Sequence, residues 1–366
     1  MALNPAWQRM GRWVVGLWVA SRLAVGVAGY LLVRELGWHR ALATWQTQPW
    51  TALTGWDTYF YVTISHSGYA HNETVAFFPF YPMLIWLWRE ALGTGDAISS
   101  LAVSNLCVLI GMAGMYILAR DRLSERHAQR AILYLVLSPY AFALVLAYSE
   151  GVFLALVTWL FVLSDREHDG WGIPLAFACG ITRITGVAVV PALALRAYRR
   201  RTVASWALAV TPLIALAAHA GWLWHAVGDP LAMVHVQSEW GGKPSFPLVP
   251  LLDQFWRFIT THDLFYLARG LTVIGYAALL IPIVRQPVFK STRWEDALYV
   301  SGILALPLLS GVLFSVGRFG LVAFPMAFAM ADVGLRRATV HRIFVTFAPS
   351  IQFLLLAGSA LGYRPP

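Results

Sequence analysis

AISSLAVSNLCVLIGMAGMYILA, residues 97–119, is a run of 23 residues without a charged side chain, and Arg120 follows it directly. A helix of about 20 apolar residues crosses the roughly 30 Å hydrocarbon layer of a membrane. The run therefore predicts a membrane-spanning helix that ends at Arg120. Other long apolar runs lie at 13–33, 203–227, 264–284, 297–316 and 343–361, and shorter ones at 131–147, 149–164 and 320–335.

The composition agrees with a chain built from such helices. Hydrophobic residues make up 58% of the sequence and charged residues only 12%, far from the composition of a soluble globular domain. No internal repeat or linker divides the chain. We therefore expect an all-α polytopic membrane protein that forms a single integral domain over residues 1–366.

The net charge of +9 can indicate an acidic partner such as nucleic acid. Here the basic residues form short clusters between the apolar runs, as the positive-inside rule predicts for cytoplasmic segments. Topology thus explains the charge, and we expect no nucleic-acid partner. The expected cytoplasmic clusters hold 17 of the 27 Lys and Arg residues, and they lie at 9–12, 120–130, 166, 196–201, 285–293 and 336–342.

These clusters set the predicted orientation of the chain. We expect the chain to lie in the cytoplasmic membrane of a bacterium, with its N-terminus in the cytoplasm. Residues 34–96 and 228–262 are then expected to form two long extracytoplasmic segments. The apolar run at 13–33 is too long for the core of a signal peptide, so we expect it to stay as an anchor.

One segment conflicts with a simple count of spans. A single helix over 171–195 would place the arginines at 196–201 on the outside. We therefore expect a break near Gly180 to Gly186, with two short helices meeting at Thr182-Arg183 and polar backbone lining a protein cavity. The span count is then eleven, or ten without the break.

The extracytoplasmic segment 34–96 combines aromatic rings with an acid. Its composition is typical of helices that lie in the membrane interface, and the run 76–88 is short enough for a re-entrant or juxtamembrane helix. From Trp56 onward, helical spacing places Asp57 and Tyr61 on one face. The alternative is that Asp57 only caps a helix, as Asp often does.

The stretch Trp56-Asp57, with Tyr61, Gly68-Tyr69 and 76–82 (AFFPFYP), resembles the first luminal loop of the PIG-V mannosyltransferases. Those enzymes add the second mannose of the GPI anchor in eukaryotes and have bacterial relatives. Later signatures follow in the same order, so that the resemblance runs from about residue 50 to 330. They are Ser138-Pro139, Tyr148-Ser149-Glu150, Thr182-Arg183 with Gly186, and Gly317-Arg318-Phe319 up to Pro325.

The resemblance implies the GT-C type of fold and a sugar donor carried on a polyprenyl phosphate. It makes Asp57 the general base of an inverting hexosyl transfer, most simply of mannose, on the extracytoplasmic side. The implied acceptor is a lipid-linked or envelope glycan. The chain is rich in arginine and contains only Lys243 and Lys290, which suggests a bacterial protein, and bacteria do not make the GPI anchor.

The departing lipid phosphate needs cationic or amide partners, because negative charge develops on it as the bond breaks. Arg183 and Arg318 are the first candidates, and Arg269 is a weaker one without a supporting motif. The alternative for each is an arginine that snorkels to the lipid headgroups. Arg22, inside the first span, is expected to pair with a carboxylate such as Glu150 or with another intramembrane partner.

The expected substrate-binding residues are mostly aromatic, which suits a sugar carried on a lipid. Glu150 is expected to bind a sugar hydroxyl or orient an arginine, although a carboxylate that favours a helix N-terminus is an equal alternative. The full set comprises Trp56, Tyr61, His66, Tyr69, Phe78, Tyr81, Tyr148 and Glu150.

Metal binding has little support in the sequence. The histidines lack the spacing of a zinc site, and Cys107 and Cys179 are expected to be packing residues. Glu73 and Asp57 together offer oxygen ligands that suit Mg²⁺ or Mn²⁺. We therefore predict no certain cofactor and leave a divalent cation as the alternative.

Two further alternatives remain open at this point. The segment 229–262 is either a lid over the donor or a passive connector. For the whole chain, the rivals to an enzyme are a transporter or lipid flippase, which also use broken helices and intramembrane charges, and a non-catalytic membrane subunit. The expected partners are the polyprenyl-phosphate sugar, the glycan acceptor and membrane lipids.

Overall fold

The structure, a computed structural model, describes residues 5–36, 53–69, 72–238 and 242–360, and these form helices without a strand. The first half contains α1 (Pro5–Leu36), α2 (Asp57–Ser67), η2 (Asn72–Ala76), α3 (Phe80–Leu92), α4 (Asp96–Arg122), α5 (Glu125–Leu137), η3 (Ala141–Leu144), α6 (Glu150–Asp165), α7 (Asp169–Gly180), η4 (Ile184–Ala188) and α8 (Val189–Arg200). The second half contains α9 (Val203–Val227), α10 (Ala232–His235), η5 (Val236–Ser238), α11 (Leu248–Thr261), α12 (Leu264–Ala278), α13 (Leu280–Arg285), η6 (Pro287–Phe289), α14 (Arg293–Ser310), α15 (Val316–Val322), α16 (Phe324–Arg336) and α17 (Ala338–Ala360).

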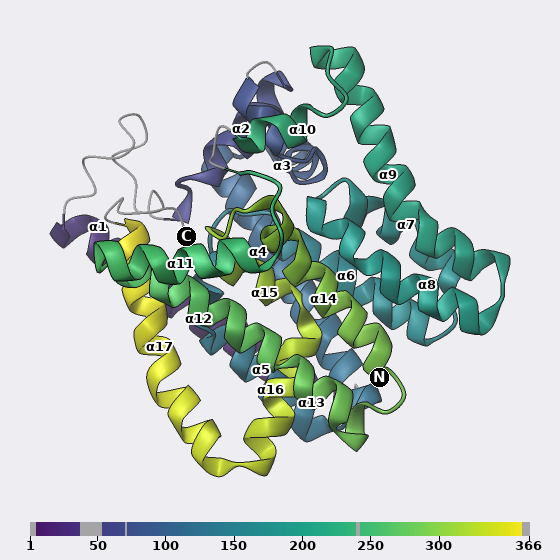
Figure 1. Cartoon of the computed structure of the whole chain (residues 1–366), viewed down its shortest axis with the longest axis vertical. Helices are drawn as coiled ribbons and strands as arrows, with labels where there is room; N and C mark the ends of the chain where they lie inside the picture. Colours follow the sequence, from purple (N-terminus) through teal and green to yellow (C-terminus); the bar gives the residue numbers. More distant parts are fainter. Residues whose placement is uncertain (1–4, 37–52, 70–71, 239–241, 361–366) are drawn as a thin grey trace.

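Figure 1 shows a bundle with α9 at one edge and α17 at the other, and with α4, α6 and α15 between them. Five helices in the described part of the chain are long and apolar enough to cross a membrane: α1, α4, α9, α17 and the run α12–α13. The pair α15–α16 adds a sixth if it is one span bent by 80°. The chain is an integral membrane protein, and the other expected spans are shorter helices such as the 16-residue α6.

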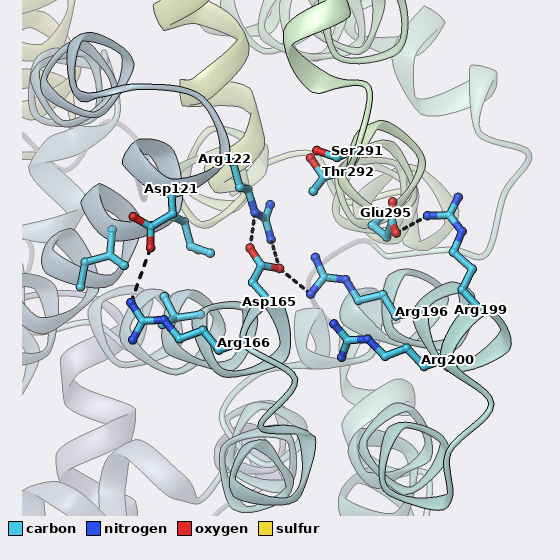
Figure 2. Close-up of a pocket in the computed structure, with 13 residues that line it drawn as sticks. Asp121, Arg122, Asp165, Arg166, Arg196, Arg199, Arg200, Ser291, Thr292 and Glu295 are labelled. Atoms are coloured by element: carbon cyan, nitrogen blue, oxygen red, sulfur yellow. Dashed lines mark hydrogen bonds and ion pairs between the residues drawn. The ribbon is translucent and has the colours of Figure 1, made fainter.

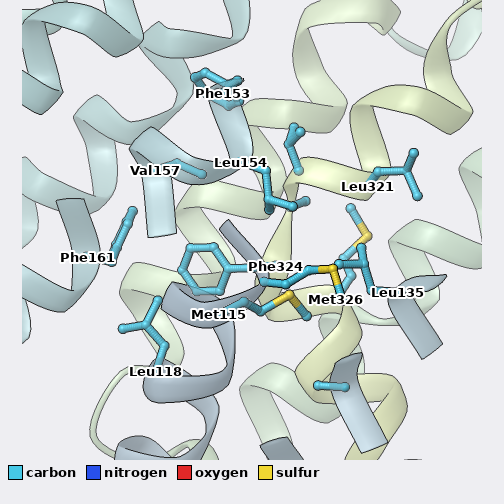
Figure 3. Close-up of a cluster of buried hydrophobic side chains, with 14 of the residues drawn as sticks. Met115, Leu118, Leu135, Phe153, Leu154, Val157, Phe161, Leu321, Phe324 and Met326 are labelled. Atoms are coloured by element: carbon cyan, nitrogen blue, oxygen red, sulfur yellow. The ribbon is translucent and has the colours of Figure 1, made fainter. Parts of the chain in front are cut away.

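The core of the bundle lies where α4, α5, α6 and α16 meet (Figure 3). Fully buried side chains from these helices interdigitate there, including Met115, Phe153, Phe161 and Phe324. Close packing of this kind leaves few voids and fixes the helices relative to one another.

Helices α4 and α6 pack in close contact because glycines line their interface. A Cβ at Gly111 would lie 2.9 Å from the Ala155 backbone nitrogen, and one at Gly151 would lie 2.6 Å from the Ser104 carbonyl. Small residues let helix backbones approach closely inside membranes. The two helices run in the same direction, since Ser104 meets Gly151 near their beginnings and Arg122 meets Asp165 at their ends.

The expected break in 171–195 is present. Helix α7 ends at Gly180, and α8 begins at Val189 after the short turn η4. Asp169, the first residue of α7, forms an ion pair with Arg200, the last residue of α8, at 2.8 Å. The chain thus enters and leaves this hairpin at the same end of the bundle, as the charge parity requires.

Ion pairs gather several expected cytoplasmic clusters at that same end. Arg122 binds Asp165 and Asp296, and Arg196 binds Asp165 as well. We call this the arginine end of the bundle. The opposite end carries Glu150, the first residue of α6, and the apex of the α7–α8 hairpin.

The structure decides two open points. Of the alternatives for Arg22, the carboxylate Glu150 is not its partner, because the guanidinium donates to Asn105 Oδ1, the Ser21 hydroxyl and the Leu144 carbonyl at 2.8–2.9 Å. The segment 229–262 is not one loop, since it contains the 14-residue helix α11. Part of its Gly-containing stretch, residues 239–241, lies outside the described residues. The short helix expected at 76–88 is α3, over Phe80–Leu92.

Candidate active site

Asp57 is the first residue of α2, and it lies at the end of the bundle that carries Glu150, because Arg318 contacts both carboxylates. The residue before it, Trp56, takes the N-cap position with φ 54° and ψ −118° and makes no side-chain cap bond. A positive φ in a bulky residue stores backbone strain, and such strain is found at functional sites. The Asp57 carboxylate does not act as the N-cap, so the simple capping alternative is not what the structure shows.

The Asp57 carboxylate is held by Arg318 of α15. Arg318 Nη1 donates to Asp57 Oδ2 at 2.7 Å, and Nη2 donates to the Ser315 hydroxyl at 2.6 Å. The guanidinium also lies over the Tyr148 ring, 5.0 Å from its centroid. Two donor bonds and one ring contact fix the orientation of the arginine.

Local packing explains why Arg318 sits in a short helix beginning after Ser315. Gly317 faces the Tyr140 ring so closely that an added Cβ would lie 2.3 Å from it. Helix α15 ends at Val322, whose carbonyl accepts a bond from the Tyr299 hydroxyl at 2.9 Å. Pro325 then stands in the first turn of α16, where its missing N–H costs nothing.

Glu150 links Arg318 to the second arginine. Its Oε1 lies 2.9 Å from Arg183 Nη1 and 3.5 Å from Arg318 Nη1, and its side chain is only 1% exposed. Neither Glu150 oxygen has the alignment of a hydrogen bond to these nitrogens, so we describe the contacts as ion pairs. The four side chains form a chain of alternating charge, Asp57, Arg318, Glu150 and Arg183, which we call the charge chain.

Ser149 joins Tyr61 to the charge chain. Its hydroxyl lies 2.7 Å from the Tyr61 hydroxyl and accepts a bond from Arg183 Nη1 at 2.8 Å. The sequence motif around Glu150 includes Ser149, but its role was not predicted from the sequence. The only feature of the sequence that pointed to Ser149 is its place next to Glu150, at a predicted turn.

The apex of the α7–α8 hairpin positions Arg183. The Phe80 amide of α3 donates to the Ile181 carbonyl at 3.0 Å, so the start of α3 is tied to the apex. A Cβ at Gly186 would lie 2.2 Å from the Cys179 carbonyl oxygen, so only glycine fits this turn. Arg183 lies over the Phe319 ring at 5.3 Å, next to Arg318 in sequence.

The other predicted aromatics surround this centre to different extents. Tyr81 contacts Tyr61 ring to ring at 4.8 Å and donates to the Ser100 carbonyl. Tyr69 and Phe78 lie farther out, where both rings pack against His219 of α9. Tyr69 and Phe78 therefore line the side of the site towards α9, without a contact to the charge chain.

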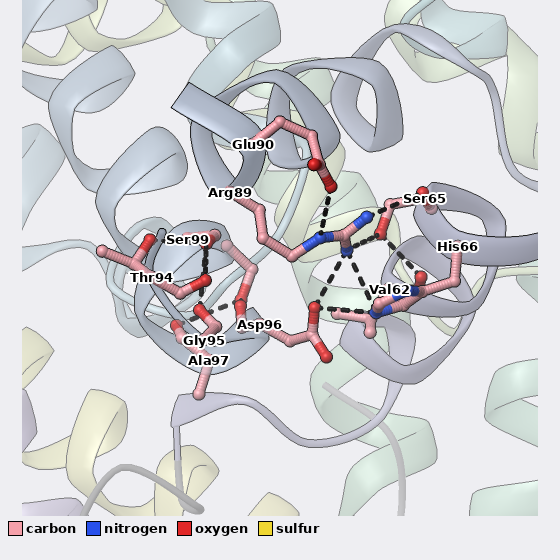
Figure 4. A network of polar contacts seen from close by, with 11 residues as sticks. Val62, Ser65, His66, Arg89, Glu90, Thr94, Gly95, Asp96, Ala97 and Ser99 are labelled. Atoms are coloured by element: carbon pink, nitrogen blue, oxygen red, sulfur yellow. Dashed lines mark hydrogen bonds and ion pairs between the residues drawn. The ribbon is translucent and has the colours of Figure 1, made fainter. Parts of the chain in front are cut away.

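His66 lies in a separate network on the exposed side of α2, shown in Figure 4. Its Nε2 lies 2.9 Å from Asp96 Oδ1 and 3.0 Å from Arg89 Nη1, and Arg89 also donates to Ser65. The structure does not bring His66 to Asp57. These contacts anchor α2 against α3 and the start of α4.

Arg269, in α12, is buried but stands apart from the charge chain. Its guanidinium lies 4.5 Å from the Phe314 ring centroid and 5.9 Å from that of Tyr266. Phe314 precedes Ser315, so Arg269 supports the segment that positions Arg318.

Metal ligands are not gathered at this site. Across the residues that the structure describes, no three His, Cys, Asp or Glu side chains form a candidate cluster. Glu73 is exposed in η2, whereas the Asp57 carboxylate faces Arg318. Cys107 and Cys179 are free thiols, and both pack among the apolar side chains of their helices.

Comparison with known proteins finds a sequence family that resembles part of this chain. Residues 40–202 match the family described as mannosyltransferase (PIG-V). The resemblance to the PIG-V mannosyltransferases is confirmed. The match covers Asp57, Glu150 and Arg183, whereas Arg318 lies beyond it and enters the PIG-V-like site through its contact with Asp57. No curated protein matches the chain in sequence.

Solved structures give the fold type. ArnT from Cupriavidus metallidurans, bound to undecaprenyl phosphate, is similar with a TM-score of 0.51 at 17% identity, over 89% of this chain and 60% of that one. The archaeal oligosaccharyltransferase AglB from Archaeoglobus fulgidus, in complex with an inhibitory peptide and a dolichol-phosphate, has a TM-score of 0.49 at 13% identity, over 95% of this chain and 56% of that one. The likeness to ArnT shows that this chain has the GT-C type of helical membrane fold, and the chain spans about 60% of the length of ArnT.

Proposed function

We propose that this chain is an inverting glycosyltransferase that moves a hexose, most simply mannose, from a polyprenyl phosphate to a hydroxyl group of a lipid-linked or envelope glycan. The observation that carries the proposal is the contact between Asp57 and Arg318 at 2.7 Å. It places one carboxylate, whose side chain is 22% exposed, in front of arginines that are 7% and 11% exposed. The acid is thus the member of the charge chain that an acceptor can reach.

In the proposed reaction, the Asp57 carboxylate takes the proton of the acceptor hydroxyl. The acceptor oxygen attacks the anomeric carbon, and the bond from that carbon to the phosphate oxygen breaks on the opposite face. The electron pair leaves on the polyprenyl phosphate, and the configuration of the sugar inverts. General-base assistance of this kind contributes about 10²- to 10⁴-fold to the rate.

Arg318 and Arg183 are proposed to bind the departing phosphate. A guanidinium has five N–H donors, and the described contacts of Arg183 use only Nη1. Arg318 Nε is buried without a partner, so Arg318 has an unused donor as well. Arginine forks match phosphate oxygens well, and a dry site makes each donor more effective.

The extracytoplasmic placement of the site is part of the same proposal. It is supported by the gathering of the arginine clusters at the opposite end of the bundle, because such clusters favour the cytoplasm. A divalent cation is not assigned a role, since the Asp57 carboxylate pairs with Arg318.

The test uses purified full-length protein in detergent with a labelled polyprenyl-phosphate mannose and an extract of bacterial envelope lipids. We expect mannosylated product with the unchanged chain and a 10²- to 10⁴-fold lower rate with Asp57→Asn. Asp253→Asn, in the exposed pair with Arg257 on α11, is the matched control and should retain full activity.

Equal activity in Asp57→Asn and the unchanged chain would remove Asp57 from the mechanism. A chain that consumes no lipid-linked sugar, but moves it across vesicle membranes, would instead favour the flippase alternative.

A further inference from the structure

A second charged centre lies at the arginine end of the bundle, opposite the proposed active site. Glu150 begins α6 and Asp165 ends it, so that 15 helical steps separate the two centres by about 22 Å along the helix axis. A cavity of about 430 Å³ opens there between the ends of α4, α6 and α8 and the start of α14 (Figure 2). That volume lies within the usual range of small-molecule sites, about 300–1,000 Å³.

The charged side chains that line this cavity include five arginines and three carboxylates. Two further carboxylates, Asp169 and Asp296, bind Arg200 and Arg122 from outside the lining. The surrounding frame is therefore balanced in charge, while the wall that faces the cavity carries an excess of guanidinium groups. An anion that enters the cavity would therefore be attracted by the excess positive charge of its wall.

The deepest part of the wall is rigid. Arg122 is 5% exposed, forms two bonds to Asp165 at 2.6 and 3.0 Å, and donates to Asp296 at 2.8 Å. Its side chain is thus locked by carboxylates on two helices. Such pre-organisation lowers the entropic cost of binding a ligand.

Arg196 and Arg199 retain donors for a ligand. Arg196 is 7% exposed, its Nη1 pairs with Asp165 at 2.7 Å, and its guanidinium lies 5.0 Å from the Phe161 ring centroid, so the described polar contacts use one of its three nitrogens. Arg199 is 45% exposed and uses Nη1 for its pair with Glu295. A buried arginine with unused N–H groups beside an open cavity is costly unless something accepts those bonds.

We propose that this cavity binds a phosphate-bearing anion, with Arg196 and Arg199 as its principal donors. Guanidinium forks suit the oxygens of phosphate monoesters and diesters, which accept two parallel bonds. The same chemistry is offered by a soluble phosphate and by the headgroup of an anionic phospholipid. This proposal does not depend on sugar transfer at Asp57, because the two centres share no residue.

The test measures binding to purified full-length protein in detergent, by the shift of its melting temperature and by titration calorimetry. The probes are inorganic pyrophosphate, compared with chloride at equal ionic strength, and short-chain phosphatidic acid, compared with phosphatidylcholine. We expect a dose-dependent stabilisation by at least one phosphate probe that exceeds its control.

Arg199→Gln and Arg196→Lys should each weaken that binding about tenfold, since each loses charge-assisted bonds to the anion. Arg257→Gln, in an exposed pair on α11, is the matched control and should bind like the unchanged chain. Because Arg199 is half-exposed, its variant is expected to fold even if the Arg196 variant does not.

A response to both pyrophosphate and phosphatidic acid would identify a site for phosphate in general, and a response to the lipid alone would identify a headgroup site. The proposal is overturned if neither probe exceeds its control, or if Arg199→Gln binds as tightly as the unchanged chain.

Discussion

Arg318 donates a hydrogen bond to Asp57 at 2.7 Å, and the two residues are 261 positions apart in the chain. The contact joins the start of α2, near the N-terminal end of the sequence, to α15 near the other end. The position of the proposed base, Asp57, therefore depends on the packing of α15, a helix that is distant from it in the sequence. Any change that moves α15 should move the carboxylate as well.

The first prediction concerns this coupling. Arg318→Gln should lower the transfer rate strongly, because the carboxylate loses its orienting donor and the leaving phosphate loses a cation. In the double variant with Asp57→Asn, we expect little further loss, since residues that act as a unit are not additive. Initial rates of the four proteins measure the coupling.

The exposed ion pair of Asp253 and Arg257, joined at 2.6 Å, provides a control double-mutant cycle. Asp253→Asn and Arg257→Gln should leave the rate unchanged, singly and together. Additive losses at Asp57 and Arg318 would contradict the coupled role.

The second prediction concerns Glu150, which is shared by two arginines. Glu150→Gln leaves Arg183 and Arg318 with one fewer buried counter-charge, and breaking a buried ion pair costs about 3–5 kcal/mol. We expect a clear fall in melting temperature together with loss of activity. Unfolding of the purified protein in detergent, followed by circular dichroism, measures the first effect.

Glu90→Gln is the control for Glu150, because Glu90 is 58% exposed in its contact with Arg89. Its effect on stability should be small, as for most surface ion pairs. A Glu150→Gln protein as stable as the Glu90→Gln protein would show that the shared carboxylate contributes nothing to folding.

The third prediction concerns the hydroxyl pair of Tyr61 and Ser149, at 2.7 Å in a fully buried position. Ser149→Ala leaves the Tyr61 hydroxyl without this partner, which costs about 1–3 kcal/mol of stability. Tyr61→Phe removes the other partner. The double variant should be less destabilised than the sum of the two, because no unpaired hydroxyl remains between them.

Chemical denaturation of the three variants measures these free energies of unfolding. A double variant that loses the full sum of the single losses would mean that the two hydroxyl groups do not interact.

The helical class, the break in 171–195 and the helix beginning at Asp57 could be predicted from the sequence. Each follows from local rules: the length of apolar runs, the parity of basic clusters and the spacing of residues on a helix face. Parity was decisive for the α7–α8 hairpin, whose ends meet through Asp169 and Arg200.

The partners of the charged groups could not be predicted in the same way. The order of the motifs indicated that Glu150, Arg183 and Arg318 belong to one site. It did not indicate which carboxylate each arginine binds. Arg22 shows the limit, because an amide, a hydroxyl and a carbonyl oxygen from three positions satisfy it in place of a carboxylate. Such choices depend on tertiary packing, which hydropathy and spacing do not contain.

The last prediction concerns the glycines between α4 and α6. A Cβ at Gly151 would lie 2.6 Å from both the Ser104 carbonyl and a Val108 methyl group. Gly151→Ala must therefore push α6 away from α4, and overpacking of this kind costs about 1–3 kcal/mol. Because Gly151 follows Glu150 directly, the shift should also displace that carboxylate and lower the transfer rate.

Two other glycines separate the effects on packing and on the site. Gly114→Ala would also clash, 2.6 Å from Thr158 Oγ1, but it lies nearer the arginine end and should reduce stability with little change in rate. Gly16→Ala, in α1 with nothing within 4 Å of its Cβ, should be neutral or slightly stabilising, because alanine is the better helix former. If Gly151→Ala and Gly114→Ala lose activity in equal proportion to stability, α6 does not transmit its displacement to Glu150 and the link between helix packing and the charge chain is wrong.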